Sequence, residues 1–312
     1  MNMEALSEQM ILLFVLILIA YIASKVKLLP ANANKVLADL VVNITNPATI
    51  LYAVATSSHA LSNGAVLSIL AITTLTLGGQ ILFAHTYTRV LRLERRPAGV
   101  YRFMLVFSNC GFLGFPILYS LMGNIGLFYG AFYLVSYNLF VWTWGLVILA
   151  RKRDDIKITP RKLILNFGTL PCVIGILLFS MNVPVPEFLK DLSSYLGGLC
   201  TPVSMLIAGA NIARRSIKKM LTSGKVYWVC AVKLIIMPIA VTFVTKVLGL
   251  PDYMIIFGCV MAAMPGPSAV TMFGELYHIS PGYAAELVGS STIISIATIP
   301  PVVMFAEWVA NL

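Results

Sequence analysis

Two short stretches of the 312-residue sequence combine polar residues, glycines and prolines inside long apolar segments. The first is Val106–Pro116, which reads VFSNCGFLGFP, and the second is Met264–Ser268, which reads MPGPS. Glycine and proline disfavour a regular helix, and two prolines that flank one glycine cannot lie in a regular helix interior. Each stretch therefore predicts an unwound segment. Its free backbone amides and helix N-termini would favour a negatively charged group, typically a carboxylate.

The candidate substrate-binding residues are those of the two stretches, together with one asparagine from an earlier apolar segment. They are Asn46, Ser108, Asn109, Cys110, Gly111, Phe112, Pro265, Gly266, Pro267 and Ser268. The alternative is a pair of kinked helices in which small residues allow close helix packing. The occurrence of two interruptions in one chain favours the binding site, because paired broken helices mark such sites in transporters.

Three further residues are candidates for coupling or charge compensation, because ionisable or polar groups inside an apolar segment are costly to bury. Lys233 lies in the middle of a segment and could neutralise an anionic substrate or replace a bound metal ion. The alternative is a structural pair with a carboxylate or with backbone carbonyls. Gln80 offers a neutral oxygen, and Glu275 lies near the end of its segment, where it could face the interface or exchange a proton.

The composition is that of an integral membrane protein. Hydrophobic residues make up 59% of the chain and charged residues only 11%, whereas soluble domains carry about a quarter. The net charge of +10 lies in short loops between apolar segments, so it does not indicate a nucleic-acid partner. The isolated cysteines resemble small buried hydrophobic residues, and no motif for nucleotide hydrolysis, metal binding or covalent catalysis is present. We therefore expect neither an enzyme nor a cofactor.

Ten apolar segments are long enough to cross a bilayer, for which roughly 20 residues are needed. They cover residues 8–24, 36–56, 64–88, 99–122, 125–149, 161–181, 192–213, 225–248, 253–276 and 283–308. Of the 22 lysines and arginines, 19 fall at the odd-numbered connections. Since basic loops stay in the cytoplasm, we expect both termini outside the cytoplasmic membrane.

The two halves of the chain share faint features at one constant offset. Asn46-Pro47 corresponds to Thr201-Pro202, and Gly111 corresponds to Gly266, each at an offset of 155 residues. Five segments per half is an odd number, so the second half would enter the membrane from the opposite side as an inverted repeat. Chance alignment of a few prolines is the alternative.

Three local sequences resemble motifs of the auxin efflux carrier family, which belongs to the larger group of bile acid, arsenite and riboflavin transporters. They are FSNCGFLGFP at residues 107–116, TPVSMLIAG at 201–209 and KLIIMP at 233–238. The resemblance covers essentially the whole chain. The long cytoplasmic loop of the larger plant carriers is missing, as in short bacterial members.

The resemblance implies an all-α fold with two domains, in which the broken fourth and ninth segments cross beside the substrate. The scaffold domain would comprise residues 1–60 and 159–222, and the transport domain residues 61–158 and 223–312. It also implies elevator-like movement, a homodimer in the lipid bilayer, and a small organic anion such as auxin or a malonate-like carboxylate as substrate.

One departure concerns coupling. The sodium symporters of the wider group carry an acidic residue in the broken ninth segment, where this chain has Pro265-Gly266-Pro267-Ser268. A sodium site needs oxygen ligands and usually a carboxylate. We therefore expect sodium-independent transport, with Lys233 in place of the ion. An anion channel, or a receptor that binds the anion without moving it, remains the alternative.

Overall fold

The computed structural model describes residues 3–30, 33–56, 63–90, 98–150, 170–181, 183–214, 224–276 and 281–312, and all regular structure in these ranges is helical. The expected all-α class is therefore confirmed. In chain order the elements, of which η denotes a π-helix, are α1 (Met3–Lys25), α2 (Ala33–Leu40), η1 (Val41–Thr45), α3 (Asn46–Ala55), α4 (Asn63–Val90), α5 (Ala98–Val106), η2 (Cys110–Gly114), α6 (Phe115–Phe140), η3 (Val141–Gly145), α7 (Leu146–Ala150), α9 (Leu170–Ser180), α10 (Glu187–Gly198), α11 (Cys200–Ala213), α13 (Gly224–Ala231), η4 (Val232–Ile236), α14 (Met237–Val247), α15 (Asp252–Ala263), α16 (Ser268–Leu276) and α17 (Pro281–Ala310).

Six helical stretches of the described chain are long and apolar enough to cross a membrane, fewer than the ten predicted. They are Leu67–Val90, Ile125–Leu149, Glu187–Ala213, Val226–Val247, Asp252–Thr271 and Tyr283–Ala310, and Met10–Lys25 is a shorter apolar helix. Four predicted segments, 8–24, 36–56, 99–122 and 161–181, are not among the six, and the last two have a plain reason. The predicted segment 99–122 is divided by a non-helical stretch, and the first part of the segment 161–181 falls outside the described residues.

Both interruptions expected from the sequence are present. Helix α5 ends at Val106, residues 107–109 are not helical, and η2 begins at Cys110. Helix α15 ends at Ala263, and α16 begins only at Ser268. The two apolar segments therefore do not run through as continuous helices.

Three of the four π-helices end two residues before a proline. Pro47 follows η1, Pro116 follows η2 and Pro238 follows η4. A proline ring collides with the carbonyl group four residues earlier in an α-helix. In each of the three cases that carbonyl belongs to the π-helix, whose wider turn accommodates the ring. The prolines thus explain where the helices widen, and η4 contains Lys233.

A single glycine reverses the chain between the fourth and fifth predicted segments. Gly123 has φ 60° and ψ −145°, a backbone conformation that is open almost only to glycine. The helical residues on either side of it, counted together as α6, therefore form two separate pieces. The second piece, which begins near Ile125, returns alongside the first, since a Cβ atom added at Gly130 would lie 2.7 Å from the Phe115 ring.

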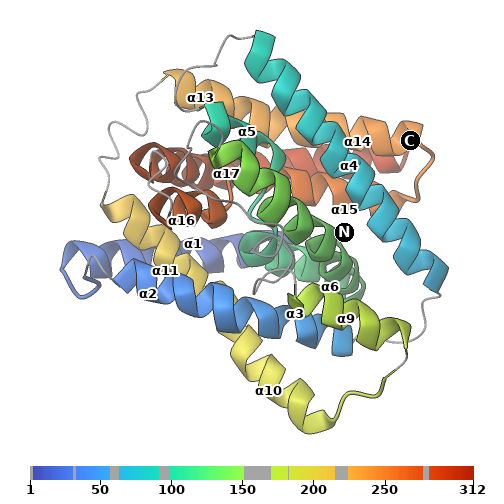
Figure 1. Cartoon of the computed structure of the whole chain (residues 1–312). Coiled ribbons are helices and arrows are strands. Elements are labelled where there is room, and N and C mark those ends of the chain that lie inside the picture. Colours follow the sequence, from blue (N-terminus) through green and yellow to red (C-terminus); the bar gives the residue numbers. More distant parts are fainter. Residues whose placement is uncertain are drawn as a thin grey trace.

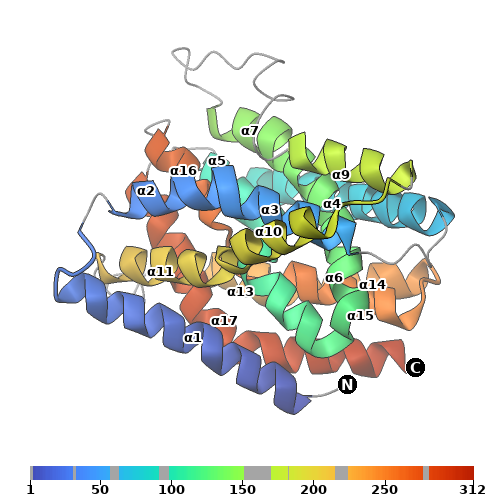
Figure 2. The same ribbon diagram turned by 90° about the horizontal axis from the view of Figure 1, so that it is seen from below.

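The helices pack in two sets. In the first set α1 packs against α11, and α3 packs against α9 and α10; Figure 2 shows α1 and α11 side by side. In the second set α4 packs against α5 and α6, while α15 packs against α14 and α17 (Figure 1). The contacts between the sets include those of α6 with α1 and α3.

The outer surface of α4 is apolar. Leu67, Leu75 and Leu82 recur at a helical spacing, and about 70% of each of these side chains is exposed. An exposed stripe of large apolar residues is the reverse of the pattern in soluble proteins and suits contact with lipid.

Gly209 allows the close approach of α11 to α1. A Cβ atom at this position would lie 2.1 Å from the Ile17 carbonyl oxygen and 2.7 Å from the Ala20 Cβ atom. We expect Gly209→Ala to separate the helices and to lower the free energy of unfolding by about 1–3 kcal/mol. Thermal unfolding of the purified protein measures the change.

The matched control is Gly78→Ala on α4, where an added Cβ atom meets no other group within 4 Å. This variant should unfold at or slightly above the native midpoint, because alanine favours the helix. An equal midpoint for the two variants would contradict the role given to Gly209.

Candidate functional site

The two interrupted stretches bind each other. The Asn109 backbone N–H donates a hydrogen bond of 2.8 Å to the Pro265 carbonyl oxygen. The Gly266 backbone N–H donates to the Ser291 hydroxyl of α17 at 3.0 Å. Unpaired backbone groups are costly where water is excluded. The two hydrogen bonds pair backbone groups of the unwound stretches that have no partner within a helix. The two unwound stretches therefore form one structural unit, called the crossing from here on (residues 107–109 and 264–267).

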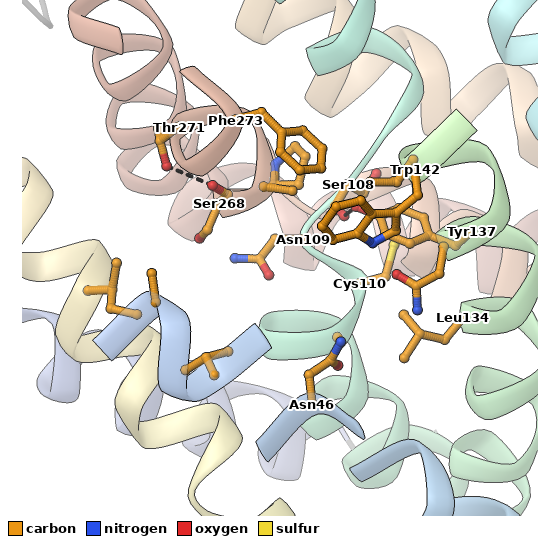
Figure 3. Close-up of a pocket in the computed structure, with 18 of the residues that line it drawn as sticks. Asn46, Ser108, Asn109, Cys110, Leu134, Tyr137, Trp142, Ser268, Thr271 and Phe273 are labelled. Atoms are coloured by element: carbon orange, nitrogen blue, oxygen red, sulfur yellow. Dashed lines mark hydrogen bonds between the residues drawn. The ribbon is translucent and has the colours of Figure 1, made fainter. Parts of the chain in front are cut away.

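The crossing leaves two helix N-termini at one cavity. This central cavity, of about 110 Å³, is lined by the start of η2 at Asn109–Gly111 and by the start of α16 at Pro267–Ala269. Helix N-termini carry partial positive charge and unpaired N–H groups. Figure 3 shows Asn109 and Ser268 at the cavity, with Asn46 on the facing helix. An anionic group placed between them would be stabilised from two sides.

No described residue that lines the central cavity is charged. Five of them are asparagines, namely Asn34, Asn46, Asn109, Asn138 and Asn211. The aromatic side chains of Tyr137, Trp142 and Phe273 also line it. The cavity thus combines neutral amides, which can both donate and accept hydrogen bonds, with flat apolar surfaces. This lining fits a small organic molecule with a polar end.

Lys233 lies behind the crossing and not in the cavity wall. Its Nζ donates a hydrogen bond of 2.5 Å to the Ser108 hydroxyl, and its side chain is fully buried. Ser108 in turn lines the cavity, and its carbonyl oxygen accepts a 2.7 Å hydrogen bond from the Tyr137 hydroxyl. In the described chain no carboxylate forms an ion pair with Lys233. A cationic group therefore lies one side chain away from the cavity.

Three other predicted residues, in or directly beside the crossing, have structural contacts. Cys110 lines the cavity, but its thiol donates to the Tyr133 hydroxyl at 3.7 Å. Gly266 lies under Met104, whose sulfur would be 2.2 Å from an added Cβ atom. Pro265 and Gly266 therefore hold the crossing together and do not line the cavity.

The other predicted residues are more distant or not described. Gln80 lines a separate small cavity between α4, α6, α14 and α15, and its Oε1 atom is buried without a donor among the described residues. The side chains of Phe112 and Glu275 lie outside the described part of the structure, although their backbones belong to η2 and α16. The predictions for these two side chains therefore stay predictions.

Several lining residues were not predicted as binding residues. Asn34 and Asn211 come from α2 and α11, and the Asn34 Nδ2 donates a 2.6 Å hydrogen bond to the Asn211 Oδ1. Asn138, from α6, lines the cavity as well. Their polarity within apolar segments could have drawn attention to these asparagines. Polarity alone, however, does not show which cavity a side chain lines.

The sequence is similar to those of known transport proteins over almost its whole length. A family model described as "Membrane transport protein" matches residues 5–303. An uncharacterized transporter of Methanothermobacter thermautotrophicus is 20% identical over 295 residues, which cover 94% of this chain and 96% of the relative. An uncharacterized transporter of Methanocaldococcus jannaschii is 21% identical over 300 residues, which cover 92% and 93% of the two chains.

Proposed function

Because this chain belongs to the membrane transport protein family, the family of the auxin efflux carriers, we propose that it is a secondary transporter of a small organic anion. The observation that carries the proposal is the central cavity, where two helix N-termini and the Asn109 amide converge. Such an arrangement favours a carboxylate, and the aromatic side chains suit the apolar part of an organic acid. Asn46 and Ser268 add hydrogen-bonding groups from both sides of the cavity.

The transport movement in this proposal is elevator-like. The scaffold would contain residues 1–60 and 159–222, and the moving domain residues 61–158 and 223–312, as two inverted five-span repeats. The boundaries near residues 60, 158 and 222 lie outside the described residues. The packing of α1 on α11 and of α15 on α14 and α17 supports such a division, since each contact stays within one proposed domain. A homodimer in the cytoplasmic membrane, with both termini outside, completes the proposal.

The test is counterflow in proteoliposomes made with the purified protein. Liposomes loaded with an unlabelled carboxylate should accumulate the same labelled compound from outside, because a carrier exchanges its substrate in both directions. Malonate, malate and indole-3-acetate are the first compounds to test. Binding without counterflow would indicate a receptor, and single-channel currents would indicate a channel. Either result would contradict the proposed function.

We further propose that Lys233 supplies the positive charge that a bound sodium ion would otherwise provide. The Nζ atom lies 2.5 Å from the hydroxyl of Ser108, a residue that lines the central cavity. We expect the initial rate of uptake to be equal in sodium and in choline buffers of the same ionic strength. A rate that rises steeply with sodium concentration would show that a sodium ion is still required.

A further inference from the structure

Trp142 presents an unpaired hydrogen-bond donor to the central cavity. It belongs to η3, is half-buried and lines the cavity. Its Nε1–H group has no acceptor among the described residues, although it is not enclosed by protein. Figure 3 shows the ring at the cavity, with its nitrogen toward the space that Asn46 and Asn109 also face. The indole nitrogen is a donor only, so the group that pairs with it must be an acceptor.

Packing fixes the orientation of this donor. The Trp142 ring meets the Phe273 ring in a T-shaped arrangement, with 4.9 Å between the ring centroids and 76° between the planes. Phe273 is fully buried and forms the same kind of contact with Phe103, at 6.1 Å. The indole ring therefore rests on a buried aromatic cluster and does not have to be ordered by the ligand. A donor that is fixed before binding contributes more to affinity than a mobile one.

The turn that carries Trp142 is the π-helix that no proline explains. The other three π-helices precede a proline, whereas η3 continues into the apolar helix α7. Its last residue, Gly145, lies so close to two phenyl rings that an added Cβ atom would be 2.7 Å from Phe103 and 3.0 Å from Phe107. Such turns occur frequently at functional sites. Within η3, Trp142 lines the cavity, whereas Trp144 packs against Phe107 and does not.

The groups around the cavity whose hydrogen-bonding role is fixed are donors. The starts of η2 and α16 supply backbone N–H groups with partial positive charge, and Trp142 supplies an indole N–H. The Asn109 side chain, only 5% exposed, also faces the cavity without a hydrogen bond to the described chain. A carboxylate, which only accepts, is not found among the described lining residues. An occupant that pairs with these groups must be rich in acceptors.

We propose that the Trp142 Nε1–H donates a hydrogen bond to an oxygen atom of the transported anion. This inference rests on the proposed function, because it names a further binding residue of the same cavity. Trp142 then recognises the charged group of the ligand, in addition to forming an apolar wall beside Phe273. Hydrogen bonds to ionised groups are shorter and stronger than those between neutral groups.

The test removes the N–H and keeps the ring. The probe is whichever of malonate, malate and indole-3-acetate stabilises the purified full-length protein most against heat, and its affinity is taken from the concentration dependence of that stabilisation. At position 142, 3-benzothienylalanine has sulfur in place of the N–H and nearly the same shape. It should weaken binding of the probe by roughly tenfold or more, the range for one hydrogen bond to a charged group. Trp142→Phe should weaken it at least as much.

Trp144→Phe is the matched control, because Trp144 packs against Phe107 and is not among the residues that line the cavity. It should bind the probe with native affinity. Native affinity with 3-benzothienylalanine at position 142 would show that the N–H contributes nothing, and would overturn the inference. An equal loss in Trp144→Phe would also overturn it, since the effect would then come from the packing of η3.

A spectroscopic measurement on the native protein decides the question if the variants at position 142 do not fold. The chain has four tryptophans, so protein labelled at the tryptophan ring nitrogens gives four indole N–H signals in a magnetic resonance spectrum. The Trp142 signal is identified by elimination, with phenylalanine variants of Trp144, Trp228 and Trp308. Saturation with the probe should move the Trp142 proton signal downfield and leave the other three in place. A Trp142 signal that does not move would refute the proposed hydrogen bond.

The outcomes separate the two proposals. If the probe binds and is exchanged in counterflow, but changes at position 142 leave its affinity unaltered, the inference about Trp142 is wrong and the transporter function stands. If none of the three acids is bound or exchanged, the proposed function fails and the inference fails with it.

Discussion

Replacing Asn109 by alanine is expected to raise the dissociation constant of the transported anion by roughly tenfold to a hundredfold, the range for one lost hydrogen bond to a charged group. The Asn109 side chain faces the central cavity and forms no hydrogen bond with the described part of the protein. Its amide is therefore available to the ligand. Thermal stabilisation by the anion measures the loss, and counterflow should fall in parallel.

The fold should survive this change because the contacts that Asn109 makes within the protein come from its backbone. Its N–H donates to the Pro265 carbonyl, and its own carbonyl accepts from the N–H groups of Leu113 and Gly114. Alanine keeps all three bonds, so the unfolding midpoint without ligand should stay within a few degrees of the native value.

A second variant tests the sign of the substrate charge. Asn109→Asp keeps the shape of the side chain but adds a negative charge beside the bound group, so it should bind an anion more weakly than Asn109→Ala does. Ser120→Ala, whose hydroxyl donates to the Ile117 carbonyl on α6 and which does not line the cavity, serves as the control. Native affinity in Asn109→Ala would argue against an anion site at the crossing.

Replacing Lys233 by methionine is expected to weaken anion binding by roughly thirtyfold without destabilising the protein. For an assumed separation of about 8 Å between the ammonium and the bound carboxylate, and an effective dielectric constant of about 20, the attraction is about 2 kcal/mol, which corresponds to that change in affinity. Methionine has a similar length and is apolar. Since a buried ammonium group without a carboxylate partner is costly, its removal should leave the unfolding midpoint unchanged or raise it.

Two variants separate the effect of the charge from that of packing. Lys246→Met is the control, because the Lys246 ammonium donates to the Ala310 carbonyl near the end of α14, away from the cavity. It should bind the anion normally. Ser108→Ala removes the hydroxyl that accepts from Lys233 but retains the charge, so its effect should be smaller than that of Lys233→Met. A lower unfolding midpoint with unchanged affinity in Lys233→Met would instead assign Lys233 a purely structural role.

The two interruptions could be predicted from the sequence because their cause is local. Proline removes a backbone donor, glycine disfavours the helix, and both effects depend only on neighbouring residues. The connection between the fourth and fifth segments was also predicted at residues 123–124, where Gly123 reverses the chain. The backbone conformation of Gly123 was not predicted, because glycine is also common in continuous membrane helices. The widening of the helices to π-helices before Pro47, Pro116 and Pro238 was not predicted.

The composition of the central cavity could not be predicted in the same way. Asn34 and Asn211 are 177 residues apart, and nothing in their neighbourhoods indicates that they form a pair. Gln80 was predicted as a coupling residue because it is polar and lies inside an apolar segment. In the structure it lines a separate cavity. The sequence shows that a polar residue in an apolar segment needs a partner, but not which helix supplies it.

By itself, the sequence determined that this is a helical membrane protein, that two of its segments are unwound, and that it resembles a family of transporters. These properties follow from composition, from local backbone chemistry and from motifs. Only the tertiary structure decided that the crossing is held by the Asn109–Pro265 hydrogen bond, that Lys233 binds Ser108, and that Asn34 pairs with Asn211. The physical reason is that these contacts join residues distant in sequence. They depend on how the helices pack, which no local pattern specifies.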